Sequence, residues 1–255
     1  MVEINRVALE GFGNAAPTYA RGRPDYPQDL LTWLQRDLGL GPQTTVIDVG
    51  AGTGKFTRLL LRTGATVLAI EPVAAMRAEL TAALPDVRAM PGTAQAMDLA
   101  DGTSDAVVCA QAFHWFADEA ALGEIHRVLQ PKGRLGLVWN VRDKSVDWVA
   151  AISDIIQPYE GDSPRYHTGD WRRALASGLF SPLEETHYGY LHVGAPRQVI
   201  VDRFLSVSFI AALPDDERAK VEDRLLALIA SHPQLSGRES VAVPYQTRAY
   251  RCTRI

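Results

Sequence analysis

The residues whose types and spacing could do chemistry begin with Asp48 and three glycines at alternate positions, Gly50, Gly52 and Gly54. Glycine lacks a Cβ and tolerates positive φ, so it is used where the backbone turns sharply or lies against a ligand. Residues 44–49 form a short apolar run that predicts a buried strand, and helical spacing of apolar residues follows the glycines. A strand, a glycine turn and a helix N-terminus together form a nucleotide-sized crevice at the carboxyl edge of a parallel sheet.

The spacing of these glycines separates the ligand classes that use such a turn. A phosphate-binding P-loop needs a glycine five residues before Gly54 and Ser or Thr after Lys55, but Val49 and Phe56 stand there. A dinucleotide fingerprint, Gly-x-Gly-x-x-Gly, needs its third glycine where Lys55 stands. A tight turn with no ligand is the remaining alternative, and the residues that follow weaken it.

A second acidic residue, Glu71, closes the next apolar run, residues 66–70. It lies 17 residues after Gly54, close to the ~20 residues at which an acid meets ribose hydroxyls in nucleotide-binding folds. A carboxylate can accept hydrogen bonds from both hydroxyls. We therefore interpret Glu71 as a ribose contact rather than as a strand end in solvent.

The run Asp-x-Gly-x-Gly-x-Gly from Asp48 to Gly54 resembles motif I of the class I S-adenosylmethionine-dependent methyltransferases. Further segments that resemble this family follow in its order, at Glu71, 92–97, 105–110 and 124–135. The resemblance covers roughly residues 15–142 and depends on several landmarks together rather than on one motif. It implies that Glu71 holds the ribose of the cofactor and that Asp48 lies close to its methionine moiety.

The resemblance also implies which residues contact S-adenosylmethionine. The family has a Gly-Asp-Ala-Glu segment whose acid meets the adenine amino group, but this chain has Thr93 and Gln95 there, so a hydroxyl or backbone groups would serve instead. The full set implied as cofactor-binding is Tyr19, Arg23, Asp48, Gly50, Ala51, Gly52, Thr53, Gly54, Glu71, Pro72, Met76, Thr93, Ala94, Gln95 and Gln111. No metal is expected, because no cluster of carboxylates follows the expected strands.

The N-terminal segment, residues 1–26, combines aromatic residues and arginines with Gly and Pro residues that argue against a long helix. We interpret it as a lid over the ligand. Its Tyr-x-x-x-Arg-Pro-x-Tyr-Pro pattern resembles the small-molecule branch that includes trans-aconitate methyltransferase-like enzymes. In that branch the Tyr and Arg, here Tyr19 and Arg23, meet the methionine end of the cofactor or an acidic substrate. The alternative is a tail whose arginine side chains are exposed to water. We prefer this alternative for Arg21 only.

The candidate catalytic residues, His114 and Trp115, follow the fourth expected strand. Methyl transfer from a sulfonium is an in-line displacement, and positioning alone can supply ~7–11 kcal/mol of its barrier. Residues 111–115 lack the Asp/Asn-Pro-Pro-Tyr/Phe turn typical of amine methylation, which favours an oxygen acceptor. A carboxylate is already ionised at neutral pH, whereas a hydroxyl needs a base, for which the unperturbed pKa of His114 is suitable. A packed histidine that supports the turn is the alternative for His114.

The resemblance implies a doubly wound α/β fold, in which such segments lie at the carboxyl edge of a sheet. We predict a Rossmann-like, mostly parallel sheet of seven strands, with helices on both faces and a helical lid or cap insertion. The chain is expected to form a single methyltransferase domain, 1–255. Its parts are expected to be the N-terminal lid 1–26, the cofactor-binding core 27–142, the cap insertion 143–182 and the C-terminal strands and helices 183–255.

The expected cap concentrates aromatic residues, and the last two strands are expected at 183–193 and 241–250. The cap aromatics either line a substrate pocket or form a satellite core. For Trp171 we prefer the core, because Leu175 and Leu179 follow it at helical spacing.

Composition narrows the partners of this chain. Its 26 Lys and Arg against 30 Asp and Glu give a net charge of −4 without a long basic run, which disfavours a nucleic-acid substrate. The two cysteines, Cys109 and Cys252, are far apart in the sequence, and neither is part of a metal-binding motif. No apolar signal core and no run of about 18 apolar residues occur, so we expect no membrane partner. These features predict a soluble, cytoplasmic protein that is a monomer or a homodimer.

We therefore expect an enzyme that uses S-adenosylmethionine to methylate a small molecule at a carboxylate or hydroxyl oxygen, leaving S-adenosylhomocysteine. A nucleotide-dependent oxidoreductase is the main alternative; Glu71 favours it and the missing third glycine opposes it. A non-catalytic S-adenosylmethionine-binding module is a further alternative, supported only by Thr93 and Gln95.

Overall fold

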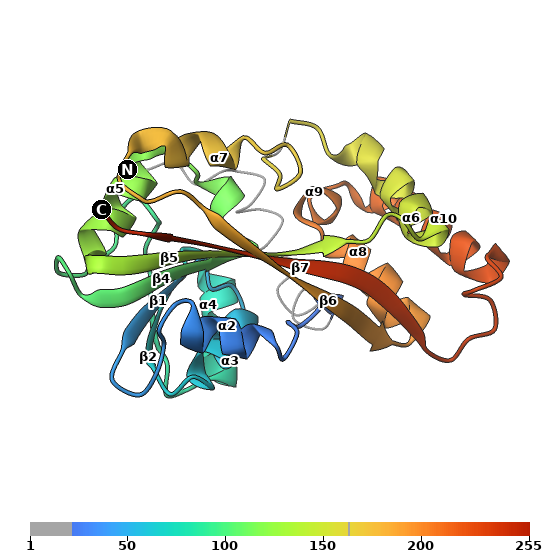
Figure 1. The fold of residues 1–255 in the computed structure, drawn as a ribbon. Coiled ribbons are helices and arrows are strands. Elements are labelled where there is room, and N and C mark those ends of the chain that lie inside the picture. Colours follow the sequence, from blue (N-terminus) through green and yellow to red (C-terminus); the bar gives the residue numbers. More distant parts are fainter. Residues whose placement is uncertain (1–21, 163) are drawn as a thin grey trace.

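One sheet of seven strands organises the chain, of which the computed structural model describes residues 22–162 and 164–255 (Figure 1). The strands are β1 (Thr45–Val49), β2 (Thr66–Ile70), β3 (Arg88–Met90), β4 (Ser104–Ala110), β5 (Leu129–Arg142), β6 (Glu184–Gly194) and β7 (Val241–Thr253). Their order in the sheet is β3-β2-β1-β4-β5-β7-β6. The first five strands run parallel, β7 runs antiparallel to β5, and β6 runs antiparallel to β7. The predicted seven-stranded sheet is confirmed, including its last two strands; the lid or cap insertion stays a prediction.

The parallel strands are apolar because helices cover both of their faces. Val46 and Ile47 of β1, on opposite faces, are both fully buried. In register, Val46 lies beside Val67 of β2 and Ala106 of β4. The strand order reverses between β1 and β4, and in such sheets a ligand crevice opens at the carboxyl ends of the two strands where the order reverses. The segments that carry the motifs, one after β1 and one after β4, therefore lie together at this crevice.

Two groups of helices pack on the two faces of the sheet. They are α2 (Leu30–Arg36), α3 (Lys55–Leu61), α4 (Ala74–Ala83), α5 (Glu119–Val128) and α7 (Trp171–Ala174), with short 3-10 turns η1 (Phe113–Trp115) and η3 (Leu175–Ser177). Figure 1 shows α2, α3 and α4 below the sheet and α5 and α7 above it. Leu30, Trp33 and Leu34 recur at helical spacing and are buried, so they form the side of α2 that packs on the sheet.

A second apolar cluster lies at the end of the sheet where β6 and β7 extend beyond the other strands (Figure 1). It is built from α6 (Asp147–Ile156), η2 (Gln157–Tyr159), the π-helix η4 (Arg197–Asp202), α8 (Arg203–Leu205), α9 (Ser208–Ala211) and α10 (Asp215–Ser231). The expected cap 143–182 thus contributes α6 to this cluster, while its Trp171 is 3% exposed and packs in the core above the sheet. Trp171 is buried in a core as expected, but that core is the main one on the sheet rather than a satellite core. The division of the chain into parts stays a prediction.

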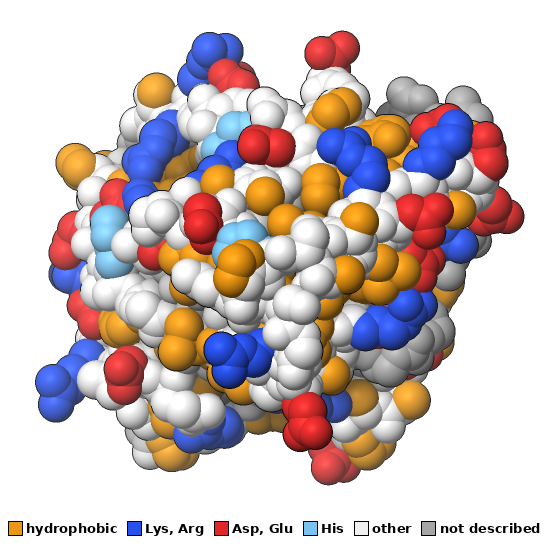
Figure 2. Space-filling model, turned by 90° about the vertical axis from the view of Figure 1, so that its right-hand side faces the viewer, with side chains coloured by type: hydrophobic (Ala, Val, Ile, Leu, Met, Phe, Trp, Pro, Cys, Tyr) orange, Lys and Arg blue, Asp and Glu red, His pale blue; other side chains and the backbone are white. Residues whose placement is uncertain are grey.

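Charged side chains of both signs are interspersed on the end of the molecule that Figure 2 shows, and no single basic stripe crosses that face. Within residues 22–162 and 164–255, no helix combines the length and the apolar character that crossing a membrane would require.

Candidate active site

The glycine turn after β1 adopts the conformation that its sequence predicts. Gly50, Gly52 and Gly54 have φ of 71°, 58° and 82°, in the left-handed region that side chains disfavour. A Cβ on Gly50 would lie 2.7 Å from Cβ of Ala112, whereas a Cβ on Gly52 would meet nothing within 4 Å. Gly50 is therefore needed for packing, and Gly52 leaves its backbone open toward a cavity.

Glu71 at the end of β2 is 6% exposed and holds this turn in place. Its Oε2 accepts the N–H of Gly52 at 2.8 Å, and its Oε1 accepts the N–H of Val73 at 2.9 Å. Burial raises the pKa of Glu71, and the two N–H groups and the charge of Arg77 oppose that rise. A carboxylate oxygen has a second lone pair, so ribose binding by Glu71 stays a prediction beside this structural role.

Asp48 is fully buried in β1 beside the same turn. Thr57 donates its hydroxyl to Oδ2 at 2.7 Å, while Oδ1 has no hydrogen-bond partner among the described residues. Burial, with a smaller effect from the charge of Glu71, raises the pKa of Asp48 to about 7, against the Thr57 hydrogen bond. An unpartnered carboxylate oxygen at the wall of a cavity suits a cationic group, and S-adenosylmethionine carries an ammonium and a sulfonium.

A cavity opens along the glycine turn, and we call it the cofactor cavity. The predicted cofactor residues that line it are Arg23, Asp48, Gly50, Ala51, Gly52, Thr53 and Gln111. Six lining residues that the sequence analysis did not single out as cofactor contacts are Pro24, Tyr26, Lys55, Phe56, Ala110 and Arg203. The structure thus brings the glycine turn, the end of β4 and the described part of the expected lid to one cavity.

The other predicted cofactor residues that the structure describes do not line this cavity. Gly54 caps the N-terminus of α3, and Pro72 follows Glu71. Met76 and Ala94 are both buried, Ala94 in the apolar core above the sheet. Gln95 donates to Asp118 at 2.9 Å, and the hydroxyl of Thr93 is buried with no partner among the described residues. Tyr19 lies outside the described residues. The adenine contact of Thr93 therefore stays a prediction, with its unpartnered hydroxyl as the supporting feature.

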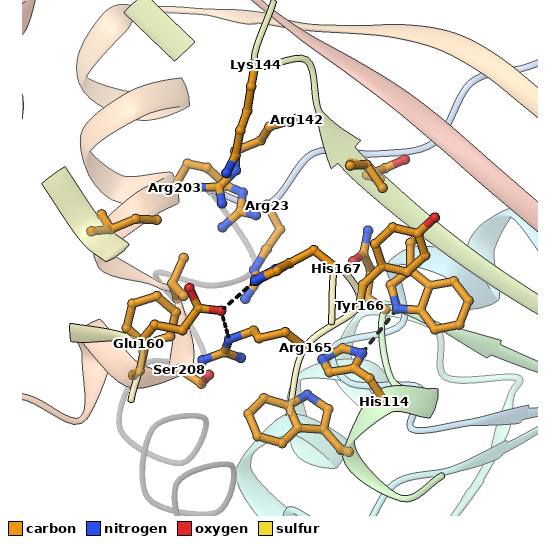
Figure 3. Close-up of a pocket in the computed structure, with 18 residues that line it drawn as sticks. Arg23, His114, Arg142, Lys144, Glu160, Arg165, Tyr166, His167, Arg203 and Ser208 are labelled. Carbon is orange, nitrogen blue, oxygen red and sulfur yellow. Dashed lines mark hydrogen bonds and ion pairs between the residues drawn. The ribbon is translucent and has the colours of Figure 1, made fainter. Parts of the chain in front are cut away.

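A second cavity, which we call the acceptor cavity, holds about 180 Å³ and adjoins η1 (Figure 3). Arg23, Gln111 and Arg203 line both cavities, so the two meet at these side chains. Gln111, directly after β4, has φ of 58° although it is not glycine. A strained backbone of this kind persists where the surrounding structure imposes it, and such residues gather at functional sites.

His114 lines the acceptor cavity and is fixed in one tautomer by β5. The indole N–H of Trp139 donates to Nδ1 of His114 at 3.1 Å, drawn as a dashed line in Figure 3. Nδ1 therefore carries a lone pair, and the proton of the neutral ring is on Nε2. Burial first, then the charges of Arg165, Arg23 and His167, lower the pKa of His114 to about 3. At neutral pH, His114 is a neutral hydrogen-bond donor, which disfavours the predicted use as a base.

Trp115 forms part of the cavity wall together with a stacked arginine. The guanidinium of Arg165 lies over the rings of Phe209 and Trp115, 4.4 and 5.3 Å from their centroids. Its Nε donates to Oε1 of Glu160 at 3.1 Å, while its Nη2 is buried without a partner among the described residues. The Glu160 carboxylate also lies 3.5 Å from Nε2 of His167 (Figure 3). Trp115 thus lines the cavity beside the Arg165 cation, and its catalytic role stays a prediction.

Cations dominate the lining of the acceptor cavity. Besides Arg23 and Arg165 they are Arg142, Lys144 and Arg203, while Glu160 is the acid among its described lining residues. The sequence analysis named only Arg23 and missed the other four cations. A signal existed for Arg142 and Lys144, which follow β5 at the edge where ligands bind in such sheets. No sequence motif marks Arg165 or Arg203.

Comparisons with known proteins agree with this geometry. Residues 47–137 match the family described as a methyltransferase domain. An uncharacterized methyltransferase of Mycobacterium tuberculosis is 38% identical over 242 residues, which cover 95% of each chain. An uncharacterized methyltransferase-like protein of Schizosaccharomyces pombe is 32% identical over 246 residues, 96% of each chain. The crystal structure of the YcgJ protein from Bacillus subtilis matches with a TM-score of 0.57 at 16% identity, covering 89% of this chain and 99% of that one.

The relatives extend over nearly the whole chain, and the matched family region contains the glycine turn, Glu71 and His114. This chain therefore belongs to the class I S-adenosylmethionine-dependent methyltransferases.

Proposed function

We propose that this methyltransferase methylates a carboxylate oxygen of a small molecule bound in the acceptor cavity. The observation that carries the proposal is that the cofactor cavity and the acceptor cavity meet at Arg23, Gln111 and Arg203. S-adenosylmethionine, when bound, supplies a methyl group on a sulfonium sulfur. An acceptor atom near Gln111 would reach that methyl group directly, which is the arrangement that in-line transfer needs.

The residues beside the glycine turn fit the cofactor. The open backbone at Gly52 admits a ligand, and the unpartnered Oδ1 of Asp48 accepts from a cationic group. Glu71 retains a lone pair on each oxygen for ribose hydroxyls, and in this proposal Arg23, which lines the same cavity, binds the methionine carboxylate. Each of these contacts is part of the proposal.

The state of His114 favours a carboxylate over a hydroxyl. A hydroxyl must lose its proton on the way to transfer, but the Nδ1 of His114 accepts from Trp139 and Nε2 already carries a proton. A carboxylate needs no base at neutral pH. One of its oxygens accepts the Nε2–H, and the other attacks while Trp115 excludes water.

An acidic acceptor also agrees with the resemblance of the lid segment to the trans-aconitate methyltransferase-like branch. We include membership of that branch in the proposal, together with a cytoplasmic location and a monomeric or homodimeric state. Size-exclusion chromatography coupled to light scattering measures that state; a larger assembly would contradict it.

Ligand-dependent melting tests the cofactor. At one hundred times its dissociation constant, a ligand that binds only the folded protein stabilises it by about 2.7 kcal/mol. S-adenosylmethionine and S-adenosylhomocysteine should raise the melting temperature, while NAD and NADP should not. A shift with NAD and none with either adenosyl compound would overturn the function.

The chemistry of the product tests the acceptor. The protein is incubated with S-adenosylmethionine labelled in its methyl group and with matched panels of carboxylic acids and phenols. A carboxyl methyl ester releases labelled methanol in mild base, whereas a methyl ether does not. Base-stable label transferred to phenols alone would contradict a carboxylate acceptor.

A further inference from the structure

The loop that carries Arg165 into the acceptor cavity has little regular structure of its own. Residues 164–170 form turns rather than a helix or a strand. Three consecutive side chains of this loop, Arg165, Tyr166 and His167, nevertheless line the acceptor cavity (Figure 3). Loops of this kind open locally at a low cost in free energy unless other parts of the fold hold them. The contacts that hold the loop therefore determine where this part of the cavity wall lies.

Tyr166 anchors the loop in a group of four aromatic side chains, which we call the aromatic box. Its other members are Trp139, Trp171 and Tyr250, and all six pairs of ring centroids lie between 4.6 and 6.5 Å apart. Aromatic pairs at such distances attract one another beyond the effect of the area that they bury. The indole N–H of Trp171 also donates to the backbone carbonyl of Tyr166 at 3.0 Å. Trp139 donates its own N–H to His114, so the aromatic box contacts the candidate catalytic histidine as well.

A chain of hydrogen bonds leads from Tyr166 away from the acceptor cavity. The hydroxyl oxygens of Tyr166 and Tyr250 are 2.6 Å apart, and Tyr250 donates to Oε1 of Glu185 at 2.6 Å. A tyrosine hydroxyl has one proton, so the proton between the two tyrosines comes from Tyr166. Burial acts to raise the pKa of Glu185, but hydrogen bonds from Tyr250 and His187 lower it below its ordinary value. Glu185 is therefore an ionised acceptor at neutral pH, and it fixes the direction of the chain.

Tyr250 is placed to hold the loop rather than to contact a substrate. It is fully buried in β7 and lines neither the cofactor cavity nor the acceptor cavity. Burial, and then its hydrogen bonds with Glu185 and Tyr166, raise the pKa of Tyr250, so its hydroxyl keeps its proton. β7 is paired with a strand on each side. The Tyr250 hydroxyl is therefore a fixed point to which the loop is attached.

Resting on the proposed methyltransferase function, we propose that Tyr250 is a positioning residue for methyl transfer. Its hydrogen bond with Tyr166 holds the loop so that the guanidinium of Arg165 stays over the ring of Trp115. This part of the cavity wall then keeps its place while the acceptor atom faces the methyl group. Transfer depends steeply on such geometry, and a displacement of about 1 Å can lower the rate about a hundredfold. Tyr250 thus contributes to the rate without contacting the acceptor or the cofactor.

Tyrosine-to-phenylalanine variants of the full chain test this proposal, because they remove a hydroxyl and keep the ring. The assay uses the compound of the carboxylic acid and phenol panels that the parent methylates fastest. Tyr250→Phe and Tyr166→Phe should each lower kcat by about tenfold or more, while the KM for S-adenosylmethionine stays within about twofold of the parent value. The double variant should be no slower than the slower single variant, since each substitution removes the same hydrogen bond between the two tyrosines. Tyr188→Phe is the matched control; Tyr188 packs against the core on the other face of the sheet, and its variant should keep the kcat of the parent.

Two measurements separate positioning from a purely structural role. Calorimetry with S-adenosylhomocysteine gives the fraction of each variant that is folded, and a loss of kcat that only matches a loss of this fraction would overturn the proposal. Hydrogen exchange with S-adenosylhomocysteine bound needs no acceptor. The amides of residues 164–170 should exchange at least about fivefold faster in Tyr250→Phe than in the parent or in Tyr188→Phe, and equal exchange would overturn the proposal.

The kinetic results also distinguish this proposal from the proposed function. A kcat within about twofold of the parent in both single variants, or losses that multiply in the double variant, would refute the positioning role and leave the methyltransferase function standing. Failure of S-adenosylhomocysteine to bind the parent would instead remove the proposed function, and with it the reaction for which Tyr250 holds the cavity wall.

Discussion

Replacement of His114 by Asn should make the protein less sensitive to acid. Burial and nearby positive charges lower the pKa of His114 to about 3 in the folded protein, whereas its ordinary value is 6.5. Asn is the matched replacement because its side-chain oxygen lies near the place of Nδ1 and can accept the Trp139 N–H, but it does not titrate.

The size of the effect follows from the difference in proton binding. As the pH falls below 6.5, the unfolded chain binds a proton at His114 and the folded protein does not until about pH 3. The stability due to the neutral ring is therefore fully present above pH 6.5 and is lost as the pH falls through that window. Between pH 7 and pH 5 the loss is about 2 kcal/mol, and any folded pKa below about 4 gives the same value.

Asp48 titrates in the opposite sense and does not disturb the comparison. Burial raises its pKa from 3.8 to about 7, so the folded protein binds this proton first and gains stability as the pH falls. The parent and the His114→Asn variant both carry Asp48. Its contribution therefore cancels when the two proteins are compared at each pH.

Urea unfolding of both ligand-free proteins at pH 7 and pH 5, at equal ionic strength, measures the effect. The free energy of unfolding of the parent should fall by about 2 kcal/mol more than that of His114→Asn, with unchanged m-values. Losses that agree within about 0.5 kcal/mol would refute the neutral state of His114 and, with it, its role as a hydrogen-bond donor.

Four further substitutions test the cofactor side. Gly50→Ala should destabilise the protein more than Gly52→Ala in urea unfolding, because only the first Cβ meets Ala112, at 2.7 Å; the left-handed φ alone costs about 1–2 kcal/mol at either position. Gly52→Ala should instead weaken S-adenosylhomocysteine binding in calorimetry, and normal affinity would contradict an open backbone facing the cofactor. Glu71→Gln should lose about 1–3 kcal/mol of stability, because its amide nitrogen cannot accept a backbone N–H, and should also bind S-adenosylhomocysteine less tightly; two unchanged values would exclude both roles. For the parent, the preference for S-adenosylmethionine over S-adenosylhomocysteine should increase between pH 6 and pH 8, as Asp48 ionises through its pKa of about 7; Asp48→Asn should show no such change.

The local sequence was enough to predict the glycine turn and the strand that precedes it. Left-handed φ at Gly50, Gly52 and Gly54 is a property that glycine alone adopts without strain, so the pattern carries its own geometry. The apolar runs likewise predict buried parallel strands, because helices cover both faces of such a sheet. The order of the landmarks then places the ends of β1 and β4 side by side.

The partners of individual polar atoms could not be predicted in this way. Glu71 was expected to face a ribose, and the structure adds two backbone N–H groups that occupy its oxygens. The unperturbed pKa of His114 indicated a base, but Trp139, on a neighbouring strand, determines which nitrogen holds the proton. Both outcomes depend on side chains brought together by the sheet rather than by sequence spacing.

The sequence by itself determined the fold class and the cofactor turn, because each depends on local conformation and on the period of apolar residues. The tertiary structure alone decided the character of the acceptor cavity. Arg142, Arg165 and Arg203 come from a strand end, a loop and a short helix, and no pattern along the chain links them. Their effect arises from burial around one space, where a charge interacts far more strongly than in water and calls for an opposite charge.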